Sequence, residues 1–364
     1  HGLARAYYYS DRSEMLAALD AALIVNPRHV PSLILLAEHQ IDCETYEAAA
    51  RTLDRALGVN PWHPQVWAYR AVLAQLGNDP NAAESHRANA LKFWPDNPEV
   101  DYLIGRKLSQ NYRFTDGAAS QRRAIQAAPD YLPARIQLAQ DLLRLGDEGQ
   151  GWVLADEVNK KDPYNVEAYN LVHLRDTLTR FRTLTADGIV LKMEAHEASV
   201  YGNQVMELLR QAKAELCRRY DFKPEGPITV ELFPNQQDFA VRTFGMPGGD
   251  GFLGVCFGNV ITATAHIKLL RQGKTQQGFG LGDGPIDASF LAIEQIIGHH
   301  YELDDFQIQS VTEGREAMGS ALVRLRANGK LYSGNGISTD IIGASIHAYL
   351  SALNKIVYEE GGRT

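Results

Sequence analysis

Five prolines recur at intervals of 34 residues through the first half of the chain: Pro27, Pro61, Pro95, Pro129 and Pro163. Each interval holds two helix-like stretches, such as residues 31–41 and 46–57, followed by a turn that ends at the next proline. A fixed period of this length indicates that each repeat is one helix pair, which buries its apolar face against its neighbours. We therefore predict a curved right-handed solenoid of four to five repeats over residues 1–175.

The repeated segment resembles the tetratricopeptide repeat in its period and in the small residues expected at helix contacts. These residues are Ala37, Ala48 and Ala56 in one repeat and Ala71, Ala83 and Ala90 in the next. The resemblance implies a concave face that can bind a peptide or another protein. Polar and aromatic candidates for that face are Asn60, Trp62, Trp67, Tyr69, Arg70, Tyr102 and Arg106. Packing between helices is the alternative role for the aromatic residues among them.

A glycine-rich turn precedes a predicted helix in the last third of the chain, where the sequence reads Gly282-Asp283-Gly284-Pro285-Ile286-Asp287-Ala288. The glycines suit a tight turn, and Pro285 suits the first position of a helix. Asp287 then places a carboxylate in the first helical turn, where the helix dipole favours it. An apolar stripe follows at spacings of four, three and four: Ile286, Phe290, Ile293 and Ile297. We predict a helix that starts near Pro285 and buries this stripe.

A second glycine-rich turn, residues 334–340 with Gly334 and Gly336, is predicted to open a second helix with Ser338 or Thr339 as its N-cap. The apolar stripe of this helix is Ile342, Ile346, Tyr349, Leu353 and Ile356, flanked by Ala344, Ala348 and Ala352. The alanines allow close approach, either to a sheet or to a second subunit. Before this helix, residues 321–326 alternate in polarity as a half-buried strand does. Residues 261–360 thus predict two successive strand-strand-helix modules.

Ordered blocks in this region resemble the C-terminal regulatory, or dimerisation, domain of 2-isopropylmalate synthase, an enzyme of leucine biosynthesis. The blocks are residues 265–269, 280–288, 310–314, 338–342 and 344–354. The resemblance implies a homodimer and a site where leucine binds as a feedback inhibitor. The ligand-binding residues it implies are Gly282, Asp283, Gly284, Pro285, Ile286, Asp287 and Ala288, with Phe306 as a cover for the leucine side chain. A simple turn and helix cap is the alternative interpretation of these residues.

Two departures from that family bear on activity. Its catalytic domain, a barrel of parallel strands and helices that binds a divalent metal, does not precede Ala265. We therefore expect no catalysis by this chain alone, and no cofactor. The opening strand of the first module also differs, because residues 252–257 occupy its place with another pattern.

Blocks at residues 193–197, 227–234, 239–243 and 254–258 resemble the segment ahead of the zinc site in gluzincin, peptidase-MA-like proteins that carry tetratricopeptide repeats. Strands are predicted at 188–193 and 228–233, with a helix from Tyr201 to Tyr220. A zinc peptidase of this kind needs His-Glu-x-x-His, and the chain has none, because His196-Glu197 continues into Ala198. We predict no metal site. Residues 245–258 are rich in glycine without a Gly-Lys-Ser or Gly-Lys-Thr, so they predict a loop.

The net charge is −8 and no basic stripe occurs, so binding to nucleic acid is not expected. The sequence has no run of about twenty apolar residues, so it predicts no membrane span. We expect a cytoplasmic protein; because the sequence begins at His1, a lost signal peptide is the alternative.

The predicted fold is multidomain: an all-α tetratricopeptide-repeat solenoid (1–178), an α+β segment resembling the pre-zinc part of a gluzincin peptidase (179–260) and an α+β regulatory domain of two strand-strand-helix modules (261–364). The predicted function is a leucine-binding, dimerising regulatory module fused to a repeat scaffold. The alternatives are a scaffold that binds a partner protein and the remnant of a repeat-bearing zinc metallopeptidase. The junction near Ile261 is either a natural fusion or an artefact, such as an assembly artefact or a gene-level chimera.

Overall fold

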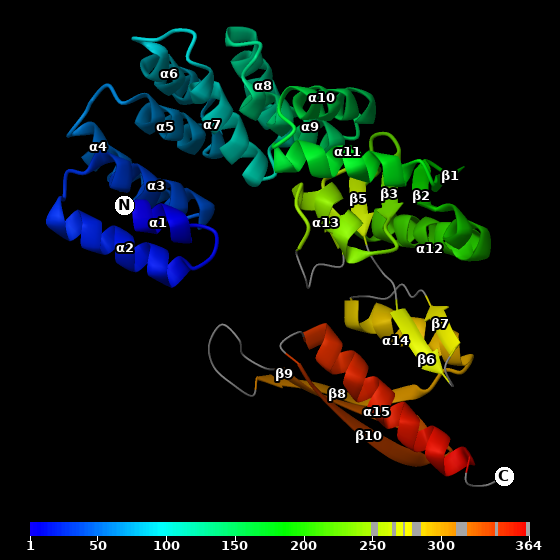
Figure 1. Cartoon of the computed structure of the whole chain (residues 1–364). Helices are drawn as coiled ribbons and strands as arrows, with labels where there is room; N and C mark the ends of the chain where they lie inside the picture. Colours follow the sequence, from blue (N-terminus) through cyan, green and yellow to red (C-terminus); the bar gives the residue numbers. More distant parts are fainter. Residues whose placement is uncertain are drawn as a thin grey trace. The chain divides into compact units, whose positions relative to one another are not determined.

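The computed structural model describes residues 1–248, 254–263, 267–271, 274–278, 285–310, 319–338 and 341–361. By its internal contacts the chain divides into two compact units, His1–Arg175 and Asp176–Thr364. Each unit is treated by itself below (Figure 1).

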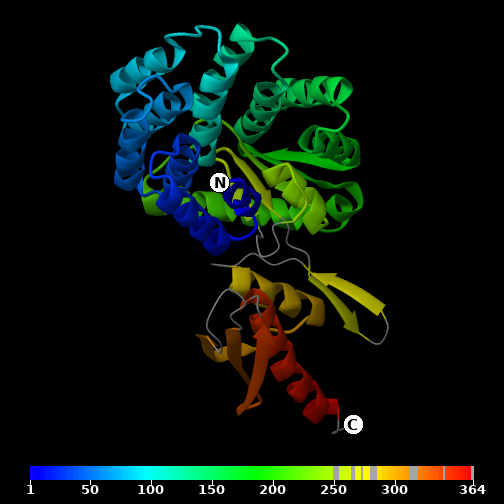
Figure 2. The ribbon, with the colours of Figure 1, turned by 60° about the vertical axis from the view of Figure 1, so that its left-hand side comes forward.

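The first unit is a helical array whose elements repeat every 34 residues. The first helices of the pairs begin at that interval: α3 (Val30–Asp42), α5 (Pro64–Leu76), α7 (Pro98–Gln110), α9 (Leu132–Leu145) and α11 (Val166–Leu178). The second helices follow the same interval: α2 (Arg12–Val25), α4 (Tyr46–Leu57), α6 (Pro80–Leu91), α8 (Phe114–Ala127) and α10 (Glu148–Lys161). The short α1 (Gly2–Tyr7) precedes α2. The predicted tetratricopeptide-like array of helix pairs is confirmed, and the pairs follow one another along a curve (Figure 2).

The turn inside each of four pairs uses one left-handed residue at the same repeat position: Glu44, Asn78, Tyr112 and Gly146. Left-handed backbone is costly for most residues with a Cβ, so Asn78 and Gly146 suit this position, whereas Glu44 and Tyr112 adopt it at a cost. The first turns of α3, α5, α6, α7 and α9 contain a proline, which has no amide to leave unpaired. The side chains of Asp11, Asp79 and Asp147 cap the starts of α2, α6 and α10. The helix boundaries are therefore set locally in each repeat.

The second unit begins with a five-stranded sheet in the order β1-β2-β3-β5-β4. Its strands are β1 (Phe181–Ala186), β2 (Ile189–Glu194), β3 (Ile228–Leu232), β4 (Gly254–Cys256) and β5 (Val260–Ala263). Strands β2, β3 and β5 are parallel, whereas β1 and β4 are antiparallel to their neighbours. Helices α12 (Ala195–Tyr220) and α13 (Gln236–Phe244) connect the strands. Part of the glycine-rich segment predicted as a loop is thus strand β4.

Helix α12 starts at Ala195, six residues before the predicted start at Tyr201. The Glu194 side chain accepts hydrogen bonds from the backbone amides of His196 and Glu197, which fixes the start of the helix at Ala195. His196 and Glu197 therefore lie in the first turn of α12, where they are part of a helix cap.

The rest of the second unit consists of two successive strand-helix modules, as predicted. The first is the antiparallel hairpin β6 (Ile267–Arg271) and β7 (Lys274–Gly278), followed by α14 (Pro285–Ile297). The second is the antiparallel sheet β8 (Glu302–Ser310), β9 (Gly319–Ala327) and β10 (Lys330–Ser338), followed by α15 (Ile341–Gly361). The sheet order is β10-β9-β8, and α15 lies along β10 (Figure 2).

Gly334 and Gly336 lie inside strand β10, so the prediction that they form a turn ahead of the helix is wrong. A Cβ atom at Gly334 would lie 1.9 Å from the Ala348 carbonyl oxygen, and one at Gly336 would lie 2.0 Å from that of Ala344. The glycines thus allow α15 to approach the strand closely. Of the two uses left open for Ala344, Ala348 and Ala352, the structure shows sheet packing, because all three are fully buried on their own sheet.

Among the described residues, no helix is both long enough and apolar enough to cross a membrane. Within the same ranges, no group of three or more His, Cys, Asp or Glu side chains is arranged to hold a metal ion.

Candidate functional site

Helix α14 begins at Pro285, where the sequence predicts it, so the ligand-binding candidates lie at and before its first turn. Gly282, Asp283 and Gly284 lie outside the described residues, as do the side chains of Pro285 and Ala288. Ile286 is half-buried against the C-terminal apolar core, and Asp287 is exposed. Phe306, on β8, packs against the same apolar core as Ile286. The structure therefore brings Ile286 and Phe306 to one cluster and leaves Asp287 at the surface.

An aromatic stack joins α14 to the second module. The Phe290 ring lies 4.3 Å from the Tyr349 ring of α15 at an interplanar angle of 22°, and meets Phe306 edge to face at 5.8 Å. Such arrangements stabilise a contact beyond the area they bury, by about 0.5–1.5 kcal/mol per pair. Phe290 is one helical turn beyond Ile286. A shift at the start of α14 would therefore disturb both β8 and α15.

Glu294, one turn further along α14, binds groups from three positions. The Tyr349 hydroxyl donates to its Oε1 at 2.6 Å, Nδ1 of His300 lies 2.7 Å from its Oε2, and the Tyr301 amide donates at 3.4 Å. Burial and the bond to this carboxylate raise the pKa of Tyr349, and the same carboxylate raises the pKa of His300. Glu294 is not among the site residues predicted from the sequence. The sequence feature that could have indicated it is a single carboxylate beside the apolar stripe, four residues after Phe290.

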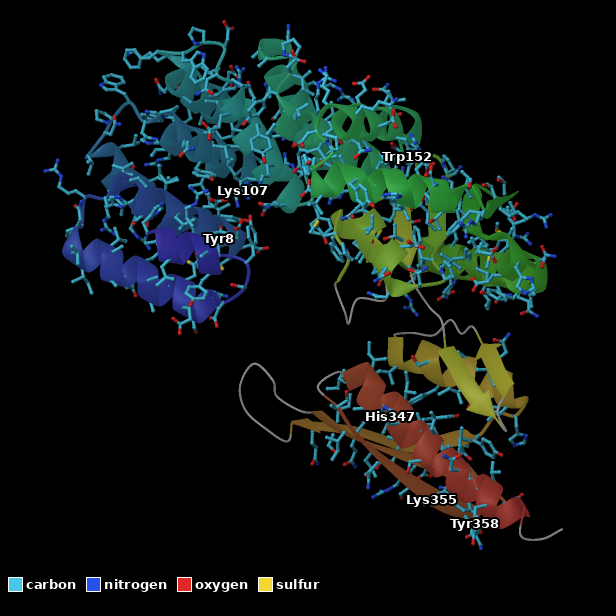
Figure 3. The ribbon with its side chains drawn as sticks, viewed as in Figure 1. Tyr8, Lys107, Trp152, His347, Lys355 and Tyr358 are labelled. Atoms are coloured by element: carbon cyan, nitrogen blue, oxygen red, sulfur yellow. The ribbon has the colours of Figure 1, made fainter. Side chains whose placement is uncertain are left out.

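A second polar cluster lies in the repeat array, between α3 and α7. The Lys107 Nζ atom lies 2.6 Å from Asp42 Oδ1 and 3.0 Å from Glu38 Oε1, and only 1% of its side chain is exposed. Arg106 donates to the Tyr9 hydroxyl at 2.8 Å, and the Tyr8 hydroxyl donates to Asp42 at 2.6 Å (Figure 3). The cluster balances two carboxylates with two cations. It links helices that are two repeats apart and so stiffens the inner side of the array.

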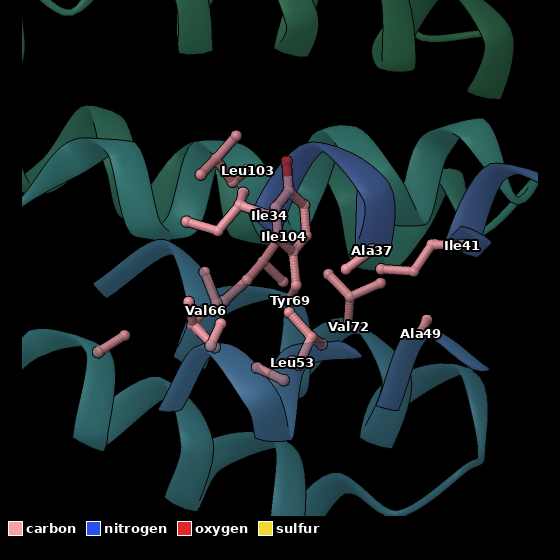
Figure 4. Close-up of a cluster of buried hydrophobic side chains, with 14 of the residues drawn as sticks. Ile34, Ala37, Ile41, Ala49, Leu53, Val66, Tyr69, Val72, Leu103 and Ile104 are labelled. Carbon is pink, nitrogen blue, oxygen red and sulfur yellow. The ribbon is translucent and has the colours of Figure 1, made fainter. Parts of the chain in front are cut away.

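The aromatic candidates of the array divide into two groups. Tyr69 is buried in the apolar core between helices, as the packing alternative expects (Figure 4). Trp62 is exposed and meets the exposed Phe93 edge to face at 5.4 Å. The Lys92 Nζ atom lies 4.1 Å above the Trp62 ring, within the range of a cation–π contact. With the exposed Trp94, these side chains form an aromatic surface at the turns between repeats.

A buried ion pair joins helix α13 to strand β3. Arg242 Nε on α13 lies 2.8 Å from Glu231 Oε2 on β3, and both side chains are almost completely shielded from solvent. Lys192 Nζ on β2 lies 3.8 Å from the same carboxylate group. Breaking a buried pair from one side costs about 3–5 kcal/mol, because the other charge stays buried. We assign these residues to holding α13 on the sheet.

A tetratricopeptide-repeat protein from Thermus thermophilus, TTC0263, aligns with 45% of this chain and 90% of its own at 16% identity, with a TM-score of 0.37.

The C-terminal part matches a family model, that of the LeuA allosteric (dimerisation) domain, over residues 253–357. The 2-isopropylmalate synthase of Clostridium kluyveri is 42% identical over 102 residues, which are 28% of this chain and 20% of that protein. The corresponding enzyme of Chromobacterium violaceum is 45% identical over 96 residues, or 26% of this chain and 19% of its own. The chain thus spans about a fifth of the length of these relatives. Residues 253–357 are homologous to the LeuA allosteric (dimerisation) domain of 2-isopropylmalate synthases.

Proposed function

We propose that residues 253–357 are a regulatory module that binds leucine and pairs two copies of the chain. The observation that carries the proposal is the match of residues 253–357 to an allosteric dimerisation domain. Helix α14 starts at Pro285, within the turn that the sequence predicts as the ligand site. We propose no reaction for the module, because its homology reaches only a fifth of each relative.

The described residues supply a physical account of leucine binding. The start of a helix favours anions, so the first turn of α14 can hold the ligand carboxylate. Asp287 is exposed in the same turn and can meet the ammonium group. Ile286 and Phe306 pack on one apolar cluster and can cover an isobutyl side chain. The Phe290–Tyr349 stack and the Glu294–Tyr349 bond would then pass a shift of α14 on to α15.

Titration calorimetry of the purified chain with leucine, valine and alanine tests this proposal. We expect leucine to bind more tightly than valine, and alanine to bind weakest, because the apolar cover rewards a longer side chain. Asp287→Asn should weaken leucine binding at least about tenfold, since bonds to charged groups contribute about 1.5–3 kcal/mol. Asp20→Asn, an equally exposed change on α2, is the matched control. Equal affinities for the three amino acids, or no binding to the folded chain, would remove leucine from the proposal.

A second proposal concerns the array, which we infer to bind a protein partner through Trp62, Phe93 and Trp94. Exposed aromatic side chains that touch one another are enriched where proteins associate. If leucine does not bind, a scaffold of this kind is the function that remains. A zinc peptidase that kept its metal would instead show bound zinc in elemental analysis of the purified protein.

A further inference from the structure

We propose that two copies of this chain join along strand β10, antiparallel and centred on Gly334, so that their three-stranded sheets form one continuous sheet. The inference rests on the proposed pairing function and names the surface that performs it. The alanine stripe of α15 is covered by its own sheet, so pairing needs another surface.

Strand β10 is an edge. Among the described residues, β9 is the one strand that pairs with it. Lys355, on the flank of α15 beyond the sheet, donates to the carbonyl oxygen of Ser333. That carbonyl therefore points away from β9. Because the direction alternates along an antiparallel strand, Leu331, Asn335 and Ile337 also direct their backbone groups outward.

The outward positions lack the features that keep edge strands apart. They are Leu331, Ser333, Asn335 and Ile337, with no charge and no proline among them. Leu331 is 49% exposed and Ile337 58% exposed, both on the face of the sheet opposite α15. An edge of this composition is suited to pairing with another strand.

The sequence of β10 is complementary to itself in one register. With Gly334 opposite Gly334 of the second copy, Leu331 faces Ile337 and Ser333 faces Asn335, and each pair occurs twice. All four positions direct their backbone groups outward, so each pair can exchange two hydrogen bonds. In the Ser333 pairs the carbonyl would exchange its bond to Lys355 for one to the second copy. The apolar pairs add cross-strand contacts of about 0.2–1 kcal/mol each. The register also uses the full length of the strand, which runs from Lys330 to Ser338.

A groove beside β10 offers room for the added strand. A cavity of about 880 Å³ lies between Tyr332 and the flank of α15, lined there by His347, Ser351, Asn354, Lys355 and Tyr358. Figure 3 shows His347, Lys355 and Tyr358 along this helix. Tyr358 is 84% exposed. Helix α15 lies over β10, so a strand added at that edge would run beneath this flank.

Two features favour a second copy as the occupant over an unrelated peptide. The register above satisfies both strands equally, as an isologous contact requires. The module is also homologous to a dimerisation domain. An extended peptide from another protein would use the same edge without self-association, which the experiment below distinguishes.

The test measures molar mass by light scattering over a range of concentrations. We expect a dimer for the parent chain and at least a tenfold weaker dimer for Ile337→Lys, because a charge enters the contact twice. Asn335→Pro should act likewise, since it removes an outward amide and leaves the β9 bonds in place. Ile308→Lys is the matched control: this isoleucine is 41% exposed on β8, the other edge strand, and its variant should pair as the parent does.

Cross-linking gives a result that does not depend on variants losing affinity. In the double variant Ser333→Cys/Asn335→Cys, the thiol at position 333 of one copy faces the thiol at position 335 of the other. Their Cα atoms would be about 5.5 Å apart, a distance that a disulfide can span. Oxidation should yield a covalent dimer. Asn335→Cys alone should not, which also controls for the exposed Cys256. A monomeric parent chain would overturn the pairing function itself. A dimeric parent whose folded variants stay dimeric and do not cross-link would overturn the β10 contact alone.

Discussion

Asp141 is the residue whose burial most affects how the array responds to pH. It lies fully buried on α9, where Ser109 donates to it at 2.8 Å and Gln137 at 3.0 Å. Burial raises its pKa from 3.8 to about 7, against the smaller opposing effect of Arg144. The folded chain therefore holds this proton more tightly than the unfolded chain. Between pH 3.8 and about 7 the stability of the array should fall as pH rises, because the unfolded state ionises first.

Asp141→Asn should remove this dependence. The amide can accept from Gln137 and donate to Ser109, whose own hydroxyl also donates to the Gly105 carbonyl. At pH 8 we expect the variant to be more stable than the parent by on the order of 1–4 kcal/mol, and at pH 4 to show no such gain. Urea unfolding followed by tryptophan fluorescence measures it, because all four tryptophans lie in the array. A gain of equal size at both pH values would contradict the assignment, and Asp20→Asn is the control.

At the scale of elements, the contact between β10 and α15 depends on two glycines. Gly334→Ala places a Cβ atom 1.9 Å from a backbone oxygen, which cannot yield as a flexible side chain can. We expect a loss of about 1–3 kcal/mol in the stability of the C-terminal module, as in overpacked cores. Hydrogen exchange of the α15 amides measures it. Gly149→Ala in α10, where nothing lies within 4 Å, should instead be neutral or stabilise slightly. Unchanged α15 protection in Gly334→Ala would contradict the close packing.

The same elements show how much the sequence predicts. The proline period predicts where the helix pairs of the array lie, since each repeat folds from local contacts. It does not predict the left-handed turn positions, because Glu44 and Tyr112 carry no sign of that conformation. Gly334 and Gly336 predict a turn wrongly, because glycine serves both turns and close backbone approaches. The start of α14 is predicted from Pro285, whereas the bond from Glu294 to Tyr349, 55 residues further along the chain, has no local sign in the sequence.

At the scale of the whole molecule, the five-stranded sheet and the region of the family match overlap in sequence. The family match begins at residue 253, yet β4 and β5 belong to the five-stranded sheet, which extends to Ala263. The first described residues of the family match, 254–263, thus contain strands of the five-stranded sheet. The domain boundaries near 178 and 260 stay predictions, and the second of them falls at the start of β5.

The division of contacts into two units at Arg175 and Asp176 leads to a last expectation about unfolding. We expect each unit to unfold by itself, so that changes in the two units add independently, usually within about 0.5 kcal/mol. Tryptophan fluorescence follows the array, and hydrogen exchange of α15 follows the C-terminal module. Asp141→Asn should shift only the first, Gly334→Ala only the second, and the double variant should show the sum of both. A change in α15 protection caused by Asp141→Asn would mean that the array and the module unfold as one, and that a partner bound to the repeats could reach the module through stability alone.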